Sequence, residues 1–464
     1  MKKNLLLLLL LCLSFTAIDS NAQAPTTLWA DNATTMWYNG TSTNFTITSA
    51  NELAGVAILV EGGNNFAGKT ITIANDLDLG AHLWKPIGKN TTFTFSGTVN
   101  GNNYVLSNLY IANLPTNSFG GLFGQITGAT IKNIKLVDAI VVGVDSVGAI
   151  AGGLMSFATV ENCHSTNGAV TGTGANIGGL VGSLLTNSSI LKSSAEGTVE
   201  GFQQVGGIVG SPYDFANVTE CYAAGNVTGF THVGGIAGYS AFAFGSNRII
   251  TINNCYSRAN VTATDSFAGG IYGGSTAQLV IKNSYSTGLI TATSGTGGLI
   301  GQIPNVTAVN NYWDLDNSNV SVAVGEWMGA PMTVDITGKT TSEMKNAAMV
   351  ILLNQNQPEL PWTIDASVND GYPILASSLL QNNSFTTVKS TVLVYPTMTA
   401  DFVNISSAVN LTNATVHSIS GSLVKSQSLH GLENTIDFSG IISGVYFLNI
   451  QTENGSSTHK IIKK

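Results

Sequence analysis

Short apolar stretches recur at a nearly constant distance through the middle of the chain. Each stretch begins with Gly-Gly or Gly-Ala, continues with two apolar residues and ends with Gly. The first glycines of successive copies lie 28, 30, 28, 28, 35 and 28 residues apart, which predicts a repeat architecture. The copies are Gly120–Gly124, Gly148–Gly152, Gly178–Gly182, Gly206–Gly210, Gly234–Gly238, Gly269–Gly273 and Gly297–Gly301.

Two further apolar positions keep the same phase, so each repeat holds three short β-prone segments separated by Gly, Asn, Ser and Thr. None of these segments reaches the roughly 10 to 12 residues of helical periodicity that a helix needs. Strands this short become stable only by stacking on the equivalent strands of neighbouring repeats. We therefore predict an all-β fold, a parallel β-helix with coils about 4.8 Å apart. A propeller is excluded because its blades need about 40 to 45 residues.

Asparagines precede the second strand of most repeats, where a side-chain amide can bond its counterpart in the next coil and tolerate a left-handed turn. Lys192 and Glu220 interrupt this predicted ladder. Its members are Asn133, Asn162, Asn254, Asn283 and Asn311. Residues 119–314 resemble the GLUG repeat family, and the best copy is Glu220-Cys-Tyr-Ala-Ala-Gly-Asn-Val-Thr-Gly229 followed by Val233-Gly-Gly-Ile-Ala-Gly238. The resemblance implies a scaffold and carries little information about function.

A solenoid needs a cap at each end. Ser49 and Glu52 form a capping-box pattern before an apolar stretch to Val60, which predicts a short helix closing the N-terminal end. We assign residues 23–118 to this cap and to irregular first coils, and 315–384 to a C-terminal cap with a helical pattern near 341–353. The six tryptophans lie in these end regions or at the last coil, where large rings would cover the open core.

The N-terminus indicates export. A basic start at Lys2 and Lys3, an apolar core from Leu5 to Leu13 and small residues before Gln23 are typical of a cleaved secretory signal peptide, assigned to residues 1–22. We expect no transmembrane segment after its removal, because no later stretch is long and apolar enough. Charged residues make up 9% of the chain with a net charge of -8 and no basic cluster, which argues against disorder and against a nucleic-acid partner.

Residues 385–464 change to a compact alternation of apolar and polar residues between turn signals, which predicts a small Ig-like antiparallel β-sandwich. The closing Gly444-Val-Tyr-Phe and Lys460-Ile-Ile-Lys segments are similar to those of the type A C-terminal sorting domain of the type IX secretion system of Bacteroidetes, although Pro396-Thr-Met replaces the usual Pro-Asn-Pro. The resemblance implies recognition by the type IX machinery, with Gly444, Tyr446, Lys460 and Lys463 as the recognised residues. It also implies transport across the outer membrane, then release or surface attachment.

Chemistry-bearing motifs are scarce. The six histidines form no zinc-ligand spacing, and the glycine-rich segments lack the residues of a phosphate loop or a nucleophile elbow, so we expect no metal and no cofactor. Asp314 and Asp316 could form a calcium loop, but a plain turn is the favoured interpretation. Cys163, Cys221 and Cys255 share one slot that faces inward as a small buried residue. Cys221 and Cys255 lie in adjacent coils, within the Cα separation of a disulfide, so a bridge between them is an open alternative.

The slot that follows the cysteines holds Tyr222, Tyr256, Tyr285 and Trp313 in successive coils. Strand alternation turns this slot outward if the cysteines face inward, which predicts an exposed aromatic stripe. Stacked rings stabilise a β-helix regardless of ligand, and this structural role is the favoured one. The functional alternative is a platform for the sugar rings of a polysaccharide.

Together these features predict a secreted or outer-surface solenoid that acts as an adhesive scaffold for polysaccharide or for host or matrix glycans. An enzyme is the first alternative, because many parallel β-helices process polysaccharides with paired or clustered carboxylates. The acids of the array occupy different phases, so such a site would lie in the first coils, around Asp76, Asp78 and Lys85. A purely structural surface component is the second alternative.

Overall fold

The computed structural model describes residues 24–112, 119–240, 248–329, 334–377 and 392–464, the last range without 397, 408, 419–421 and 453–454. The signal peptide at 1–22 and the boundary at 384/385 lie outside the described residues. The chain divides into two compact units, Met1–Ser377 and Ser378–Lys464. No helix of the described part has the length and apolar character of a membrane span.

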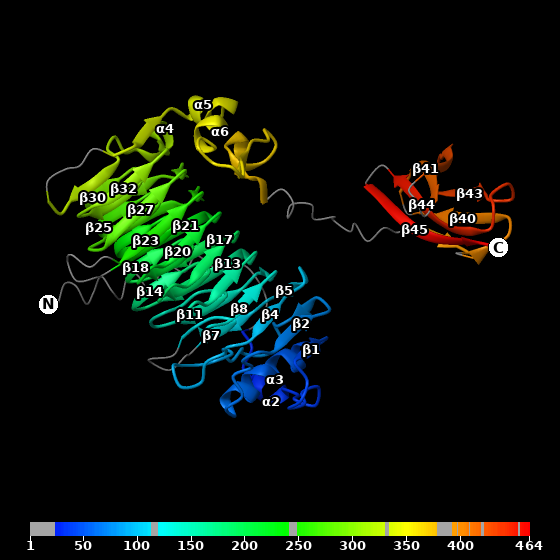
Figure 1. Ribbon diagram of the computed structural model, residues 1–464, viewed down its shortest axis with the longest axis horizontal. Coiled ribbons are helices and arrows are strands. Elements are labelled where there is room, and N and C mark those ends of the chain that lie inside the picture. The colour runs from blue at the N-terminus through cyan, green and yellow to red at the C-terminus, as the bar shows by residue number, and fades with distance from the viewer. Residues whose placement is uncertain are drawn as a thin grey trace. The chain divides into compact units, whose positions relative to one another are not determined.

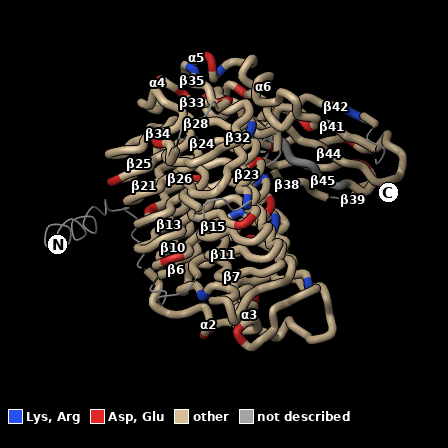
Figure 2. The backbone as a smooth tube through the Cα atoms, turned by 60° about the vertical axis from the view of Figure 1, so that its left-hand side comes forward, with Lys and Arg blue, Asp and Glu red and all other residues tan. Residues whose placement is uncertain are grey.

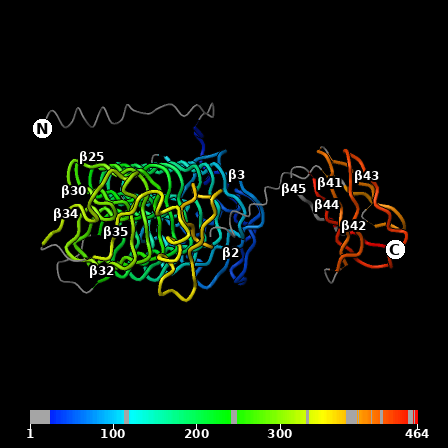
Figure 3. Tube along the Cα trace, turned by 90° about the horizontal axis from the view of Figure 1, so that it is seen from above, coloured from blue at the N-terminus to red at the C-terminus, as the bar shows by residue number. Residues whose placement is uncertain are grey.

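The first unit is a parallel β-solenoid, as predicted, with its coils stacked one on another from the blue to the yellow end (Figures 1 and 3). In the described residues its strands form three sheets. Sheet I comprises β1 (Asn44–Ile47), β2 (Thr70–Ile73), β4 (Thr98–Asn100), β8 (Thr130–Lys132), β12 (Thr159–Glu161), β16 (Ser189–Leu191), β20 (Asn217–Thr219), β23 (Ile249–Asn253), β27 (Gln278–Lys282) and β32 (Val306–Val309).

In each coil, the strands of sheet II follow the strand of sheet I along the chain. The strand of sheet III comes next, after the glycine pair. Sheet II comprises β3 (Leu77–Asp78), β5 (Val105–Ser107), β6 (Tyr110–Ile111), β9 (Lys135–Val137), β10 (Ile140–Gly143), β13 (His164–Gly172), β14 (Ala175–Gly178), β17 (Ser194–Glu200), β18 (Gln203–Gly206), β21 (Tyr222–Gly234), β24 (Tyr256–Ser257), β25 (Asn260–Gly269), β28 (Tyr285–Ser286), β29 (Ile290–Thr291), β30 (Ser294–Gly297), β33 (Asn311–Asp314) and β35 (Ile336–Lys339). Sheet III comprises β7 (Phe123–Thr127), β11 (Ala151–Met155), β15 (Val181–Leu184), β19 (Val209–Pro212), β22 (Ala237–Ser240), β26 (Tyr272–Ser275), β31 (Ile300–Ile303) and β34 (Val324–Trp327).

The repeated glycine pair lies at the corner between sheets II and III, beside the backbone of the next coil. A Cβ atom on Gly179 would lie 2.0 Å from the carbonyl oxygen of Gly207, and one on Gly207 would lie 2.1 Å from that of Gly235. The nearby carbonyl leaves little room for a side chain, which explains why glycine recurs there; Ala149 is the exception among the seven copies. The branched residues at the centre of the sheet I and sheet II strands point inward and form one continuous apolar core.

The predicted asparagine ladder lies at the corner between sheets I and II. Asn133 and Asn162 have left-handed backbones with φ of 57° and 51°, and Asn162 Nδ2 donates to Asn133 Oδ1 at 2.7 Å. Lys192 and Glu220 take the same conformation, with φ of 49° and 53°. The left-handed turn therefore continues through the two coils that lack the amide.

The last coil is one residue out of phase with the prediction. Asn310, and not Asn311, has the left-handed φ of 54°, and its Nδ2 donates to Asn283 Oδ1 at 3.1 Å. Asn311 is fully buried and donates to the carbonyl oxygen of Ile281 at 3.0 Å. Repeat spacing does not distinguish between two adjacent asparagines, whereas the pairing of β33 with β28 does.

Short helices occupy the two ends of the solenoid. Helix α3 (Ala50–Glu61) begins after Ser49, whose side chain accepts from the backbone N–H of Glu52, as the capping pattern predicts. It follows α2 (Trp29–Asn32) and buries Leu53 and Val56 against the first coil. The other end holds α4 (Leu315–Ser318), α5 (Thr341–Met344), α6 (Ala347–Leu353), the 3₁₀ turn Asn369–Gly371 and an antiparallel pair of β36 (Trp362–Thr363) with β37 (Ile374–Leu375).

The second unit is a small sandwich of two sheets around one apolar core, as predicted. Its three-stranded sheet holds β38 (Leu393–Tyr395), β40 (Phe402–Ser406) and β43 (Glu433–Asp437). Its five-stranded sheet holds β39 (Met398–Thr399), β45 (Gly455–Lys463), β44 (Gly444–Thr452), β41 (Leu411–Ser418) and β42 (Leu423–Ser428).

Gly207→Ala should lower the free energy of unfolding by about 2–3 kcal/mol, because its methyl group meets the backbone of the next coil. Gly40→Ala is the control, since nothing lies within 4 Å of its Cβ position, and should change stability by less than about 0.5 kcal/mol. Urea denaturation followed by Trp fluorescence measures the solenoid alone, because all six tryptophans belong to the first unit. Equal stability of the two variants would contradict the close-approach argument.

Candidate functional site

The tyrosines of the predicted stripe stack on one another, one per coil. Tyr222 in β21 is paired with Tyr256 in β24, and Tyr256 with Tyr285 in β28. Their ring centroids lie 4.8 and 5.2 Å apart with interplanar angles of 4° and 6°, close to the coil separation. Each such ring pair contributes about 0.5–1.5 kcal/mol beyond its buried area.

The stripe does not continue to Trp313. The register places Tyr312 opposite Tyr285, and Trp313 opposite Ser286, which is the same one-residue shift as in the asparagine ladder. Trp313 therefore points into the solenoid core, where its Nε1 donates to the carbonyl oxygen of Val320 at 2.9 Å.

The expectation that the stripe is exposed is wrong. Tyr256 is 3% exposed and Tyr285 is fully buried, while Tyr222 at the far end of the stack is half-buried. The chain after the last coil runs back along the flank of the solenoid and covers the rings with apolar side chains. The covering side chains are Met344, Met349, Leu353, Trp362, Tyr372 and Leu375.

Polar contacts fasten this C-terminal cap to the coils. Asn254 Nδ2 donates to Gln357 Oε1 at 2.9 Å, and its Oδ1 accepts from Trp362 Nε1 at 3.1 Å. Arg258 forms an ion pair with Asp370, and the hydroxyl of Tyr285 donates to the carbonyl oxygen of Pro373. Sugar rings therefore cannot stack on Tyr256 and Tyr285, because the C-terminal cap covers both rings.

Burial also removes these phenols from acid–base chemistry. Desolvation raises the pKa of Tyr256 and of Tyr285 well above the ordinary value, with the neighbouring tyrosine adding to the effect at Tyr256. Both rings are neutral at physiological pH and serve as packing. Their contribution is to stability.

At the other end of the slot, His164 and Ser194 lie in successive coils. His164 Nδ1 and Ser194 Oγ are 2.8 Å apart, and His164 Nε2 lies 3.3 Å from Asn162 Oδ1. Burial, with a smaller effect of Lys135, lowers the pKa of His164 to about 4. Ser194 is itself buried, so this arrangement has no access for a substrate.

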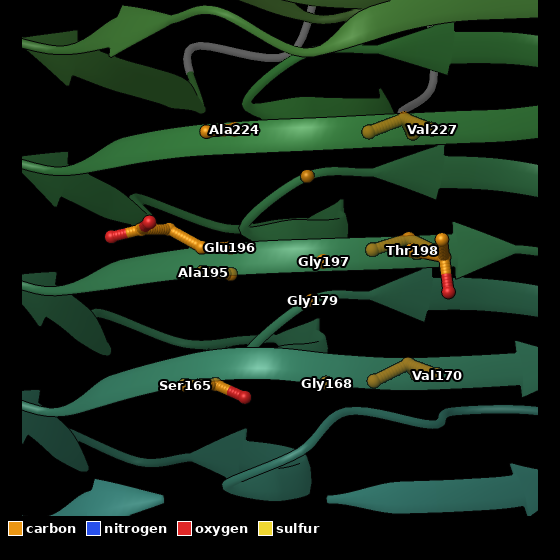
Figure 4. Close-up of a pocket in the computed structure, with 12 residues that line it drawn as sticks. Ser165, Gly168, Val170, Gly179, Ala195, Glu196, Gly197, Thr198, Ala224 and Val227 are labelled. Atoms are coloured by element: carbon orange, nitrogen blue, oxygen red, sulfur yellow. The ribbon is translucent and has the colours of Figure 1, made fainter. Parts of the chain in front are cut away.

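A small, partly open cavity lies between sheet II and the glycine corner (Figure 4). Its lining is mostly Gly, Ala and Val. Glu196 supplies its carboxylate, which accepts from the hydroxyl of Tyr222 at 2.8 Å. The cavity lacks the second carboxylate that glycoside hydrolysis needs.

The acidic side chain of Asp314, which the sequence offers as a calcium ligand, instead accepts hydrogen bonds from backbone N–H groups and from the C-terminal cap. Asp314 accepts from the N–H groups of Asp316 and Asn317 and from the hydroxyls of Thr341 and Tyr372. The Asp314–Asp316 segment is thus the cap of α4, as the turn interpretation expects. The described residues contain no group of three His, Cys, Asp or Glu that could hold a metal ion.

The two arginines of the chain, Arg248 and Arg258, both have acidic partners. Arg248 lies 3.3 Å from Asp214, and Arg258 pairs with Asp370 in the cap. The repeat spacing does not predict either ion pair, because Asp214 lies at a corner of its coil and Asp370 lies more than a hundred residues after Arg258. Charged groups are otherwise sparse along the solenoid (Figure 2).

The three cysteines face the core and are fully buried. All three are free thiols in the structure, so the bridge considered between Cys221 and Cys255 is not formed there. Their Sγ atoms donate to backbone carbonyls of the preceding coil, at 3.5 Å from Ile190 for Cys221 and 3.5 Å from Val218 for Cys255.

The four residues that the resemblance to the sorting domain assigns to recognition lie on one hairpin of the second unit. Gly444 pairs with Lys463, Tyr446 with Ile461, and Phe447 with Lys460. The ring of Tyr446 is mostly buried and its hydroxyl donates to the carbonyl oxygen of Ile442 at 2.8 Å. The position of the Lys460 side chain lies outside the described residues.

Comparisons with known proteins agree with this architecture. Residues 393–464 match the family described as a secretion system C-terminal sorting domain, and residues 173–200 and 203–228 match the GLUG motif. The chain carries GLUG repeats and a type IX sorting domain. This domain interacts with the type IX machinery and directs export, followed by secretion or attachment at the outer cell surface.

Two further proteins are similar to the GLUG-repeat chain. Halomucin from Haloquadratum walsbyi is 35% identical over 115 residues, which are 25% of this chain and 1% of halomucin. A crystal structure of a "putative immunoglobulin A1 protease" from Bacteroides ovatus has 20% identity and a TM-score of 0.44, with 77% of this chain and 99% of that chain covered.

The thiols of the GLUG-repeat chain should resist alkylation in the folded state. Burial raises the pKa of Cys163 to about 12 and that of Cys221 well above its usual value, so the reactive thiolate is scarce at pH 8 and shielded as well. For protein without residues 1–22, and so without Cys12, intact mass after iodoacetamide should show no adduct on native protein and three adducts after denaturation without reductant. A single adduct on denatured protein from the oxidising exterior would indicate a Cys221–Cys255 bridge.

Proposed function

We propose that the GLUG-repeat chain is a non-enzymatic scaffold that binds polysaccharide or matrix glycans outside the cell. The observation that carries this proposal is the isolation of the glutamates in the sheets of the described coils. Within the sheets, Glu161, Glu196 and Glu200 each face residues without a carboxylate in both neighbouring coils. A rigid, repetitive and sparsely charged surface suits retention of a long neutral polymer.

An enzyme centred on the first coils is the second candidate, and the contacts of its residues weigh against it. Asp76 Oδ1 accepts from the backbone N–H of Val105 at 2.8 Å, and Asp78 Oδ1 accepts from that of Gly80 at 2.9 Å. Lys85 forms an ion pair with Glu61, whose pKa the hydrogen bonds of Lys85 and Lys89 lower. These groups hold turns and the N-terminal cap in place.

The full exported chain should be retained on members of a panel of polysaccharides and matrix glycoproteins without releasing reducing sugar. Retention is measured by co-sedimentation and affinity electrophoresis, and release by a reducing-end assay on the same samples. The variant Asp76→Asn with Asp78→Asn is the control and should be retained equally. Sugar release by the wild type that this variant loses would establish the enzyme, and neither retention nor release would favour a structural component.

Export should depend on the second unit. We propose that Gly444, Tyr446, Lys460 and Lys463 are read by the translocon, since the first and last of these pair directly on the β44–β45 hairpin. Deleting residues 392–464 in a type IX-competent host should leave the chain in the periplasm. Lys460→Ala with Lys463→Ala should reduce surface delivery, whereas Lys425→Ala, which removes a half-buried lysine on strand β42 of the same sheet, should not. Fractionation and immunoblotting measure delivery, and normal export of the double variant would contradict the assignment.

A further inference from the structure

Two phenylalanines occupy a corner of the coil where the backbone disfavours them. Phe157 and Phe215 have φ of 65° and 63°, in the left-handed region that bulky side chains seldom adopt. The strand registers place Gly128 and Asn187 in the same slot, with φ of 60° and 57°. Glycine and asparagine are the residues that tolerate this conformation best. Two of four successive coils therefore carry the favoured residue types, and the other two carry a bulky ring.

Burial does not offset this backbone strain. Phe157 is 69% exposed and Phe215 is 45% exposed. Other left-handed phenylalanines of the solenoid do gain packing: Phe66 is fully buried in the core, and the ring of Phe267 lies 4.8 Å from that of His232. Backbone strain that no packing within the protein offsets is found at functional sites. The rings of Phe157 and Phe215 are best explained by something they contact outside the protein.

The geometry of the corner fits a linear ligand. Backbone bonds from Phe157 N to Thr186 O (3.0 Å) and from Asn187 N to Asp214 O (2.9 Å) place the three coils side by side. Phe157 and Phe215 are thus two coils apart, about 9.6 Å along the axis, with Asn187 between them. Two columns run beside this one in the same coils, one polar (Ser156, Thr186 and Asp214) and one half-buried and largely apolar (Met155, Leu185 and Tyr213).

We propose that this corner, with Phe157, Asn187 and Phe215 as its exposed column, binds a neutral β-1,4-linked polysaccharide that lies parallel to the solenoid axis. This rests on the proposed function and names its binding surface. A pyranose ring has an apolar C–H face that stacks on an aromatic ring and hydroxyls at its edge that bond to amides, hydroxyls and carboxylates. Alternate rings of a β-1,4 chain present the same face, and their repeat is close to the separation of Phe157 and Phe215.

Neutrality of the ligand follows from the charges at the corner. Asp214 lies 3.3 Å from Arg248, so the nearest carboxylate is already compensated by a cation. A hydroxyl can donate to such a paired carboxylate, whereas an additional charge on the ligand would gain little from it.

The chain contains a matched control on another face. Phe202 and Phe230 are also exposed, but their rings stack on each other at 5.1 Å with an interplanar angle of 13°, and neither has a left-handed backbone. Mutual stacking across adjacent coils accounts for this pair without a ligand.

The test compares Phe157→Asn/Phe215→Asn with Phe202→Asn/Phe230→Asn in the full chain. Binding to cellulose and chitin is measured by depletion isotherms, with a β-1,3-glucan as the linkage control, and stability by thermal unfolding. Because asparagine suits the left-handed slot, as at Asn187, the corner variant should unfold at the same or a higher temperature. It should bind the β-1,4 polymers roughly tenfold or more weakly. The control variant should bind as the wild type does.

The outcomes separate the corner from the wider proposal. If the wild type binds a polysaccharide or matrix glycan and the corner variant binds it equally, the corner assignment is wrong and the scaffold function stands. Loss of thermal stability in the corner variant would show that the rings are structural and would overturn the strain argument. A wild type that is retained only by a matrix protein, or by nothing in the panel, would overturn both proposals.

Discussion

Parallel backbone hydrogen bonding between successive coils is the constraint on which the first unit depends. At Gly179 and Gly207, a carbonyl group of the following coil occupies the space that a Cβ atom would need. Once the coils are in contact there, each slot of the repeat lies directly over its counterpart. The asparagine ladder, the buried cysteines and the tyrosine stack are all consequences of this one registration.

The same registration creates a surface that the chain then has to cover. Tyr256 and Tyr285 form a continuous apolar stack on the flank, and the C-terminal cap lies over it with Trp362 and Met349. Asn254, Arg258 and Asp314 anchor the cap through hydrogen bonds and an ion pair. Because these rings have become core, an external ligand has to use other positions, and the exposed corner of Phe157 and Phe215 is the place where ring exposure and backbone strain coincide.

Export and surface presentation are assigned to different units. The sandwich of the second unit has its own apolar core, and the residues carried over for sorting share one hairpin in it. The solenoid contains the periodic positions that can meet a long polymer. Separate cores allow each unit to fold by its own contacts.

The solenoid, its period, the inward cysteine slot, the N-terminal helix and the final sandwich could all be predicted from the sequence, because each depends on local propensity or on a short repeat. The last coil could not be placed to the residue, since Asn310 and Asn311 fit the ladder equally well until β33 pairs with β28. Whether the tyrosines are exposed could not be predicted from the sequence, for a different reason. Strand alternation fixes that Tyr285 points away from the solenoid core. Only the tertiary fold decides that Trp362 and Pro373, 77 and 88 residues later, lie there instead of water.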